Sequence, residues 1–309
     1  MRFAPGWAPP GACARPSPPA RREPRRRRTV VDFSESDRKL EQLIASEGHA
    51  PRQAEGAELY CGLDVGTAFI VLAVVDAAGE PVACAYRFAD VVRDGMVVDY
   101  IGACDIAREL KAELEGQLGV ELVHCAAAIP PGTENLDGGV VRNVAESAGF
   151  EVSAMLDEPT AANLLIGLSD GAVVDIGGGT TGVSIVQGGR VLESVDESTG
   201  GTHLTLVLAG AKGMAFAEAE AYKREPSHHA EVLPIVRPTV DKVATIVARA
   251  IAPYDVDEVV LVGGTAELTG IEQRVEKQLG IATRKPAHPM FVTPLGIALG
   301  CLAAERGGR

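Results

Sequence analysis

Two stretches of the chain repeat the same order of apolar and polar positions. In each, an apolar run ends in an aspartate, glycines follow, and a second apolar alternation begins at once. The first copy covers residues 59–75 around Asp64, and the second covers residues 172–186 around Asp175. Apolar alternation bounded by glycine turns is typical of paired β-strands. The repeat therefore predicts two similar lobes, each presenting one aspartate to a shared cleft.

Helical and strand patterns alternate through the rest of the chain. Apolar residues four apart, as in Ile106, Leu110, Leu114 and Leu118, indicate amphipathic helices. Helices are expected at 34–46, 102–118, 137–148, 213–223, 239–252, 271–279 and 294–303. Further strands are expected at 82–88, 122–129, 152–156, 190–194 and 257–262. Strands that alternate with helices predict an α/β protein with helix-covered sheets.

The expected organisation is an N-terminal region and two lobes. Residues 1–57 form a disordered basic arm plus a short helix, 58–168 the first lobe, and 169–309 the second, with the final helix (294–304) returning to the first lobe. The arm, residues 1–28, holds seven of the 19 prolines and cannot bury enough apolar surface to fold. A translation start near Val30 is favoured over an arm that docks on an anionic partner.

Charge and composition narrow the function classes. Residues 1–28 carry eight arginines and one acid, so the remainder must carry −20 to reach the formal net charge of −13. Such an acidic body argues against nucleic-acid binding by the folded part. No apolar run approaches the length of a membrane helix, so no membrane insertion is expected. The six cysteines contain no C-x-x-C pair, which disfavours zinc and favours a cytoplasmic location.

The glycine turn after Asp175 is the strongest chemical signal. Successive backbone N–H groups in such a turn form a concavity that binds anions, and the aspartate can hold a cation opposite. Gly177, Gly179 and Gly182 also satisfy G-x-G-x-x-G, but the dinucleotide fingerprint requires a helix on those glycines. Here an apolar strand and another turn follow. The turn therefore indicates a metal–phosphate site.

Four motifs spread over about residues 58–304 resemble those of the actin-like ATPase superfamily. Asp64–Thr67 and Asp175–Thr181 resemble its two phosphate motifs, and Gly263–Thr265 its adenosine motif. Asp157–Ala162 is closest to the DnaK-type chaperone branch. Residues 89–95, 156–161, 174–182, 199–203 and 291–295 are most similar to the chaperone-like family of bacterial ethanolamine utilization. The resemblance implies a two-lobed actin-like fold of duplicated ribonuclease-H-like lobes, with a nucleotide cleft between them and reduced outer subdomains.

The same resemblance implies a role for each matched residue. Asp64 and Asp175 would face Mg²⁺, while Glu158, together with Asp175, would serve catalysis by positioning or deprotonating the attacking water. The residues expected to bind ATP or ADP are Asp64, Gly66, Thr67, Gly177, Gly178, Gly179, Thr180, Thr181, Gly200, Gly201, Gly263, Gly264 and Thr265.

Two departures leave the function open. DnaK-type chaperones carry an aspartate where this chain has Gly182, and no convincing match to their catalytic lysine is found. Hydrolysis is therefore expected to be slow, or nucleotide acts only as a switch. The first hypothesis is an ATP-dependent chaperone or reactivating factor for an ethanolamine-degrading enzyme or microcompartment protein, itself cytoplasmic and microcompartment-associated. The alternatives are a nucleotide-switched scaffold or cytoskeletal protein and, ranked last, a small-molecule kinase using Glu158 or Asp157 as base.

Overall fold

The computed structural model describes residues 30–93, 96–131 and 138–307, and its first lobe is built on one five-stranded sheet. The strands of this sheet are β1 (Leu59–Val65), β2 (Phe69–Asp76), β3 (Pro81–Phe88), β6 (His124–Ile129) and β7 (Glu151–Asp157). Their order is β3-β2-β1-β6-β7. The hairpin strands β1, β2 and β3 pair antiparallel, whereas β1, β6 and β7 run parallel. A two-stranded ribbon, β4 (Val92–Arg93) with β5 (Met96–Val97), follows β3.

The second lobe repeats this sheet strand for strand. Its strands are β8 (Asp170–Ile176), β9 (Thr181–Gln187), β10 (Arg190–Glu197), β11 (Glu258–Val262) and β12 (Ala282–Arg284). Their order, β10-β9-β8-β11-β12, and their directions match those of the first sheet. The predicted duplication is therefore confirmed, and Asp64 and Asp175 occupy equivalent places in β1 and β8.

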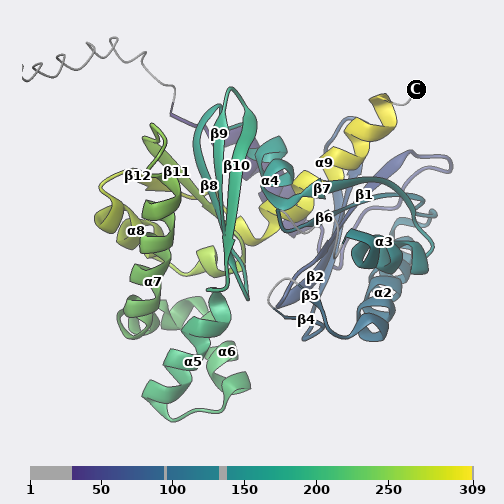
Figure 1. The fold of residues 1–309 in the computed structure, drawn as a ribbon. Helices are drawn as coiled ribbons and strands as arrows, with labels where there is room; N and C mark the ends of the chain where they lie inside the picture. Colours follow the sequence, from purple (N-terminus) through teal and green to yellow (C-terminus); the bar gives the residue numbers. More distant parts are fainter. Residues whose placement is uncertain (1–29, 94–95, 132–137, 308–309) are drawn as a thin grey trace, which may run out of the picture.

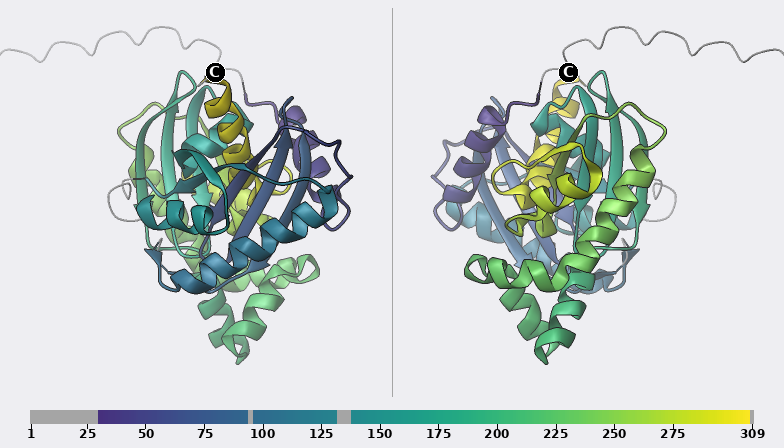
Figure 2. Two further views of the ribbon diagram at one scale, coloured as in Figure 1. Left: turned by 90° about the vertical axis from the view of Figure 1, so that its right-hand side faces the viewer. Right: turned by 90° about the vertical axis from the view of Figure 1, so that its left-hand side faces the viewer.

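Helices cover the outer face of each sheet (Figure 1). In the first lobe these are α2 (Tyr100–Leu118) and α3 (Gly138–Ser147), and in the second they are α7 (His229–Ile251) and α8 (Ile271–Leu279). The pair α5 (Gly201–Lys212) and α6 (Phe216–Arg224) projects from one end of the second lobe, as Figure 2 also shows. The second lobe also contains three short 3₁₀ turns, η1 (Pro226–His228), η2 (Gly264–Glu267) and η3 (Pro289–Phe291).

Two helices lie between the sheets and form a core common to both lobes. These are α4 (Glu158–Ile166) and α9 (Val292–Gly307). The buried cluster around them includes Val71 of the first sheet and Val260 of the second. The helices meet at Gly296, where a side chain would overlap the carbonyl of Ala161. This contact holds α9 against α4 backbone to backbone.

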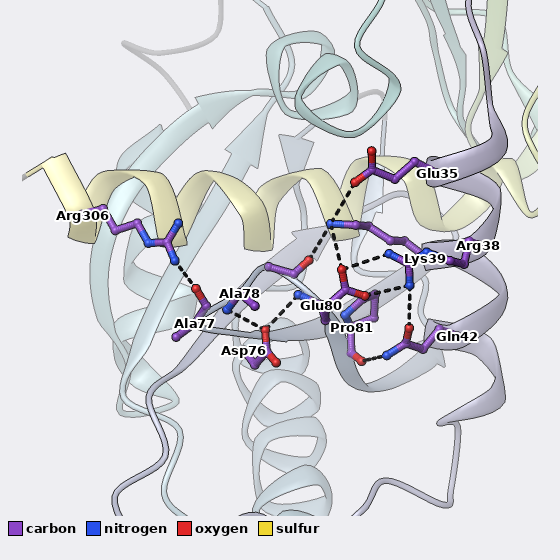
Figure 3. Close-up of polar contacts among 11 residues, drawn as sticks. Glu35, Arg38, Lys39, Gln42, Asp76, Ala77, Ala78, Glu80, Pro81 and Arg306 are labelled. Atoms are coloured by element: carbon purple, nitrogen blue, oxygen red, sulfur yellow. Dashed lines mark hydrogen bonds and ion pairs between the residues drawn. The ribbon is translucent and has the colours of Figure 1, made fainter.

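The helix α1 (Ser34–Ala45) connects the two lobes. Val31 donates its backbone N–H to Glu258 of the second lobe at 3.0 Å, and the Ala287 N–H donates to Asp37 at 2.7 Å. Two residues further, Lys39 donates to the carbonyl of Gly79 in the first lobe at 2.8 Å, within the polar cluster drawn in Figure 3. The sequence alone allows two roles for this helix, packing on the first lobe or binding a partner. The structure shows it packed on the first lobe, with Leu40 and Leu43 buried in the core cluster that includes Cys84 of β3.

Several predicted element boundaries were wrong. The helix expected from residue 213 begins at Phe216, because Gly213 ends α5 with a φ of +66°. The helix expected from residue 239 begins at His229 and continues through Pro234 and Pro238. Tertiary packing of Val232 and Val236 outweighs the hydrogen bonds that the prolines remove.

Two further differences concern a cap and a strand. The sequence makes Ser36 a candidate N-cap of the first helix. In the structure its hydroxyl donates to the Phe33 carbonyl instead, and the Asp32 carboxylate accepts from the Ser34 N–H. Strand β12 lies in a stretch where no strand was predicted. The arm at residues 1–28 lies outside the described residues. In the described part of the chain, no helix combines the length and apolar character needed to cross a membrane.

Candidate nucleotide site

A pocket with a volume of about 110 Å³ opens between the lobes and is lined from both. Its walls include eleven of the predicted site residues: Asp64, Gly66, Thr67, Glu158, Asp175, Gly177, Gly178, Gly179, Thr180, Gly263 and Gly264. The carboxyl ends of parallel strands β1 and β6 in one lobe and β8 and β11 in the other meet here. Ligands of α/β sheets bind at such strand ends.

The two glycine turns touch each other across the cleft. A side chain on Gly178 would lie 3.3 Å from Thr67 Cβ and 3.2 Å from Ala68 Cβ. The Gly177 carbonyl accepts hydrogen bonds from the Gly201 N–H at 2.9 Å and the Thr265 hydroxyl at 2.8 Å. These two hydrogen bonds hold the Gly177 carbonyl in place, and they thereby fix the conformation of the glycine turn that lines the pocket.

Asp64 and Asp175 are partly buried carboxyl groups that line the pocket from different lobes. Burial raises the pKa of Asp64 to about 7, and the negative charge of Asp175 adds to the shift. Burial also raises the pKa of Asp175 to about 6, although the Thr293 hydroxyl donates to its Oδ2 at 3.1 Å and opposes this shift. The two groups therefore repel each other when both are ionised, which is the condition that a bound cation relieves.

Glu158 enters the same pocket as the first residue of α4. Asp157 caps this helix by accepting the Thr160 N–H at 2.9 Å, which fixes where Glu158 emerges. Burial raises the pKa of Glu158 well above its usual value, and the charges of Asp175 and Asp64 add to the effect. A carboxyl group held at raised pKa beside an anion-binding loop is suited to accept or hold a proton.

Four predicted residues do not line the pocket. The Thr181 hydroxyl is buried and donates to the Thr199 carbonyl at 2.5 Å. Gly200, Gly201 and Thr265 lie behind the glycine turn and contact its backbone. They support the loop in the structure, and their predicted contacts with nucleotide stay predictions.

Other residues near the site were missed by sequence reasoning. Thr293, whose hydroxyl donates to Asp175, lies in a stretch whose only sequence signal is its family resemblance. Lys223 is buried and donates to the Gly201 carbonyl at 3.1 Å, while its ammonium pairs with Glu220 at 2.8 Å. The Arg224 guanidinium lies 5.2 Å from the ring centre of Phe69, joining α6 to the first lobe. A lysine and an arginine beside each other in α6 carried no distinguishing sequence signal.

The donor set fits a hydrated divalent cation. No group of three or more His, Cys, Asp or Glu side chains within the described ranges is arranged to enclose a metal. Mg²⁺ usually keeps several waters and takes one or two carboxylates together with substrate phosphates. Two carboxyl groups of raised pKa beside a glycine turn meet that requirement.

Two family models match parts of the chain. The model for the type IV pilus assembly protein PilM matches residues 160–290, and the Hsp70 protein model matches residues 96–207. Among solved structures, MreB5 of Spiroplasma citri bound to AMPPNP is similar with a TM-score of 0.63 at 16% identity, covering 82% of this chain and 98% of that one. These likenesses establish the actin-like ATPase fold.

Closer relatives are proteins of ethanolamine utilization. The ethanolamine utilization protein EutJ of Escherichia coli K12 is 46% identical over 246 residues, which is 79% of this chain and 87% of the relative. The crystal structure of EutJ from Carboxydothermus hydrogenoformans has a TM-score of 0.82 at 46% identity, covering 87% of this chain and 99% of that one. With this identity, coverage and fold, the chain belongs to the EutJ family of ethanolamine utilization proteins, within the actin-like ATPases.

Proposed function

We propose that this protein binds Mg²⁺ and ATP between its lobes and acts as a nucleotide-dependent chaperone or reactivating factor in ethanolamine utilization. The observation that carries the proposal is the meeting of Asp64 and Asp175, from equivalent strands of two lobes, beside two glycine turns in one pocket. MreB5 of Spiroplasma citri, which was solved bound to AMPPNP, has a similar fold and supports nucleotide binding by this chain.

Each lobe would contribute a defined part of the site. Asp64 and Asp175 would hold the cation, which when bound neutralises phosphate charge. The turns at Gly66–Thr67 and Gly177–Thr180 would receive the phosphates through backbone N–H groups. Glu158 would orient the attacking water and accept its proton. Because phosphate contacts come from both lobes, nucleotide binding would favour the closed arrangement of the lobes.

Calorimetry with Mg²⁺ and ATP tests the binding proposal. Asp175→Asn and Asp64→Asn should each weaken Mg²⁺-ATP binding at least tenfold, because each removes one carboxylate charge that attracts the cation. Asp170→Asn, at the start of the same strand β8, is the matched control and should bind as the wild-type chain does. Equal affinity in all four proteins would contradict the assigned site.

The proposed partner is an ethanolamine-degrading enzyme or a protein of the bacterial microcompartment. A nucleotide can control such a partner only if the partner binds the open and closed lobes differently. Immobilised wild-type protein should therefore capture different amounts of the purified enzyme with and without ATP, whereas the Asp175→Asn variant, in which ATP binding is weakened, should capture the same amount in both conditions. Equal capture in all four conditions would contradict the chaperone role.

A nucleotide-switched scaffold is the second candidate. Gly182 favours it, because this residue lines the pocket and offers no side chain to orient a water. Light scattering that rises with ATP in the purified protein would support assembly. Scattering that stays constant at every nucleotide and protein concentration tested would contradict it.

A further inference from the structure

Three residues form a row across adjacent strands of the second lobe. Gly182 of β9 pairs directly with Asp175 of β8 on one side and with Asp196 of β10 on the other. Directly opposed residues of antiparallel strands point their side chains to the same face of the sheet. Asp175 and Gly182 both line the pocket, so this face is the cleft face. The row therefore places one carboxylate on each side of Gly182, which has no side chain.

The Asp196 carboxylate reaches the space over Gly182. A Cβ atom built on Gly182 would lie 3.6 Å from Asp196 Oδ1, an ordinary contact distance. The Thr180 hydroxyl, in the glycine turn that lines the pocket, donates a hydrogen bond to this carboxylate. Asp196 also remains accessible to solvent, so its second oxygen can accept from a water.

Glu158 approaches the same region from the first lobe. The charge of Asp196 contributes to the raised pKa of Glu158, after the larger effects of burial and of Asp175 and Asp64. Glu158 lines the pocket, and Asp196 lies next to Gly182, which lines it as well. The Glu158 and Asp196 carboxylates can thus accept hydrogen bonds from one water molecule on different sides.

We propose that Asp196 is a positioning residue, whose carboxylate accepts a hydrogen bond from the attacking water across the space that Gly182 leaves open. This rests on the proposed function, because the role exists only where a nucleoside triphosphate occupies the cleft. The carboxylate that residue 182 cannot provide would be supplied from the neighbouring strand. Gly182 then does not by itself indicate loss of hydrolysis.

The step is an ordinary in-line hydrolysis. The water oxygen forms a bond to the γ-phosphorus while the bond from that phosphorus to the β–γ bridging oxygen breaks, and its electron pair leaves with ADP. The proton of the water passes to Glu158. Asp196 stays ionised and fixes the direction of the water.

The test compares two complexes of each protein. Affinity for ADP with Mg²⁺ reports the nucleotide site, and the added affinity when aluminium fluoride is present reports the arrangement that resembles the transition state. Asp196→Ala should leave ADP affinity within about twofold and lower the preference for aluminium fluoride at least tenfold. Glu197→Ala, whose side chain lies on the opposite face and pairs with Arg249, is the matched control.

A double variant that moves the carboxylate from position 196 to position 182, on the paired strand, tests whether the lost preference for aluminium fluoride is restored. In the Asp196→Ala background, Gly182→Asp places a carboxylate on the same face, and the 3.6 Å contact shows that a Cβ is accommodated there. This double variant should recover most of the preference. A merely structural role for Asp196 would not be restored in this way.

The outcomes separate this inference from the proposed function. An unchanged preference in Asp196→Ala, or a loss that the folded double variant does not recover, would overturn the role of Asp196. A wild-type chain that binds ADP with no added preference for aluminium fluoride would overturn it as well. Binding of neither ligand by the wild-type chain would instead contradict the nucleotide site itself.

Discussion

Among single residues, Asp64 combines a proposed role in cation binding with a cost to stability. Its raised pKa, about 7 against an ordinary 3.8, means that the folded protein binds a proton more tightly than the unfolded chain does. Stability is therefore lost as pH rises from about 4 through about 7, when the buried group must ionise. The site is under electrostatic strain whenever its ligand is absent.

Asp64→Asn should accordingly stabilise the ligand-free protein. At pH 8 without Mg²⁺, we expect a gain in unfolding free energy of about 2–4 kcal/mol, falling toward zero near pH 4. Denaturant unfolding at both pH values measures it. Because the same change should weaken Mg²⁺ and ATP binding, a variant that loses both stability and affinity would refute this account.

Glu158 offers a second prediction at this scale. Glu158→Gln keeps the size of the side chain and its place at the start of α4 but removes the proton acceptor. ATP affinity should stay within about threefold, and single-turnover hydrolysis should fall about 100-fold. Asp157→Asn, which retains the helix cap, is the control and should hydrolyse normally. Equal rates in wild type and Glu158→Gln would remove the catalytic role of this residue.

At the scale of elements, the crossing of α4 and α9 depends on Gly296. Gly296→Ala should cost about 1–3 kcal/mol of unfolding free energy, because the added methyl group meets the backbone of Ala161. Gly300→Ala in the same helix meets only the flexible side chains of Leu156 and Leu164 and should be nearly neutral. Equal costs at the two positions would show that the backbone contact is not what limits the crossing.

The elements also show what sequence patterns could predict. The repeated strand pairs and α8 followed from local periodicity, because apolar alternation and glycine turns lie close together in the chain. The start of α7 did not, since Pro234 and Pro238 indicate a break that only tertiary packing overrides. Similarly, the motifs located Asp64 and Asp175, whereas the positions of Thr293 and Asp196 depend on strand order and helix packing.

For the whole molecule, the core around α4 and α9 joins residues of both sheets. We therefore expect one cooperative unfolding transition instead of separate transitions of the lobes. Scanning calorimetry should give equal calorimetric and van't Hoff enthalpies, and Mg²⁺ with ATP should raise the midpoint without splitting it. Two resolved transitions in the ligand-free protein would contradict this expectation.

The helix α1 sets the kind of motion that remains available. Asp37 accepts a hydrogen bond from the Ala287 N–H of the second lobe. Its neighbours Arg38 and Lys39 donate to Glu80 and to the Gly79 carbonyl of the first lobe (Figure 3). Because these hydrogen bonds come from adjacent positions on one helical turn, they oppose sliding of the lobes past each other at this edge. We therefore expect a change in the width of the cleft to be a rotation with α1 near its axis. A partner that binds α1 would restrict this rotation without contacting the nucleotide.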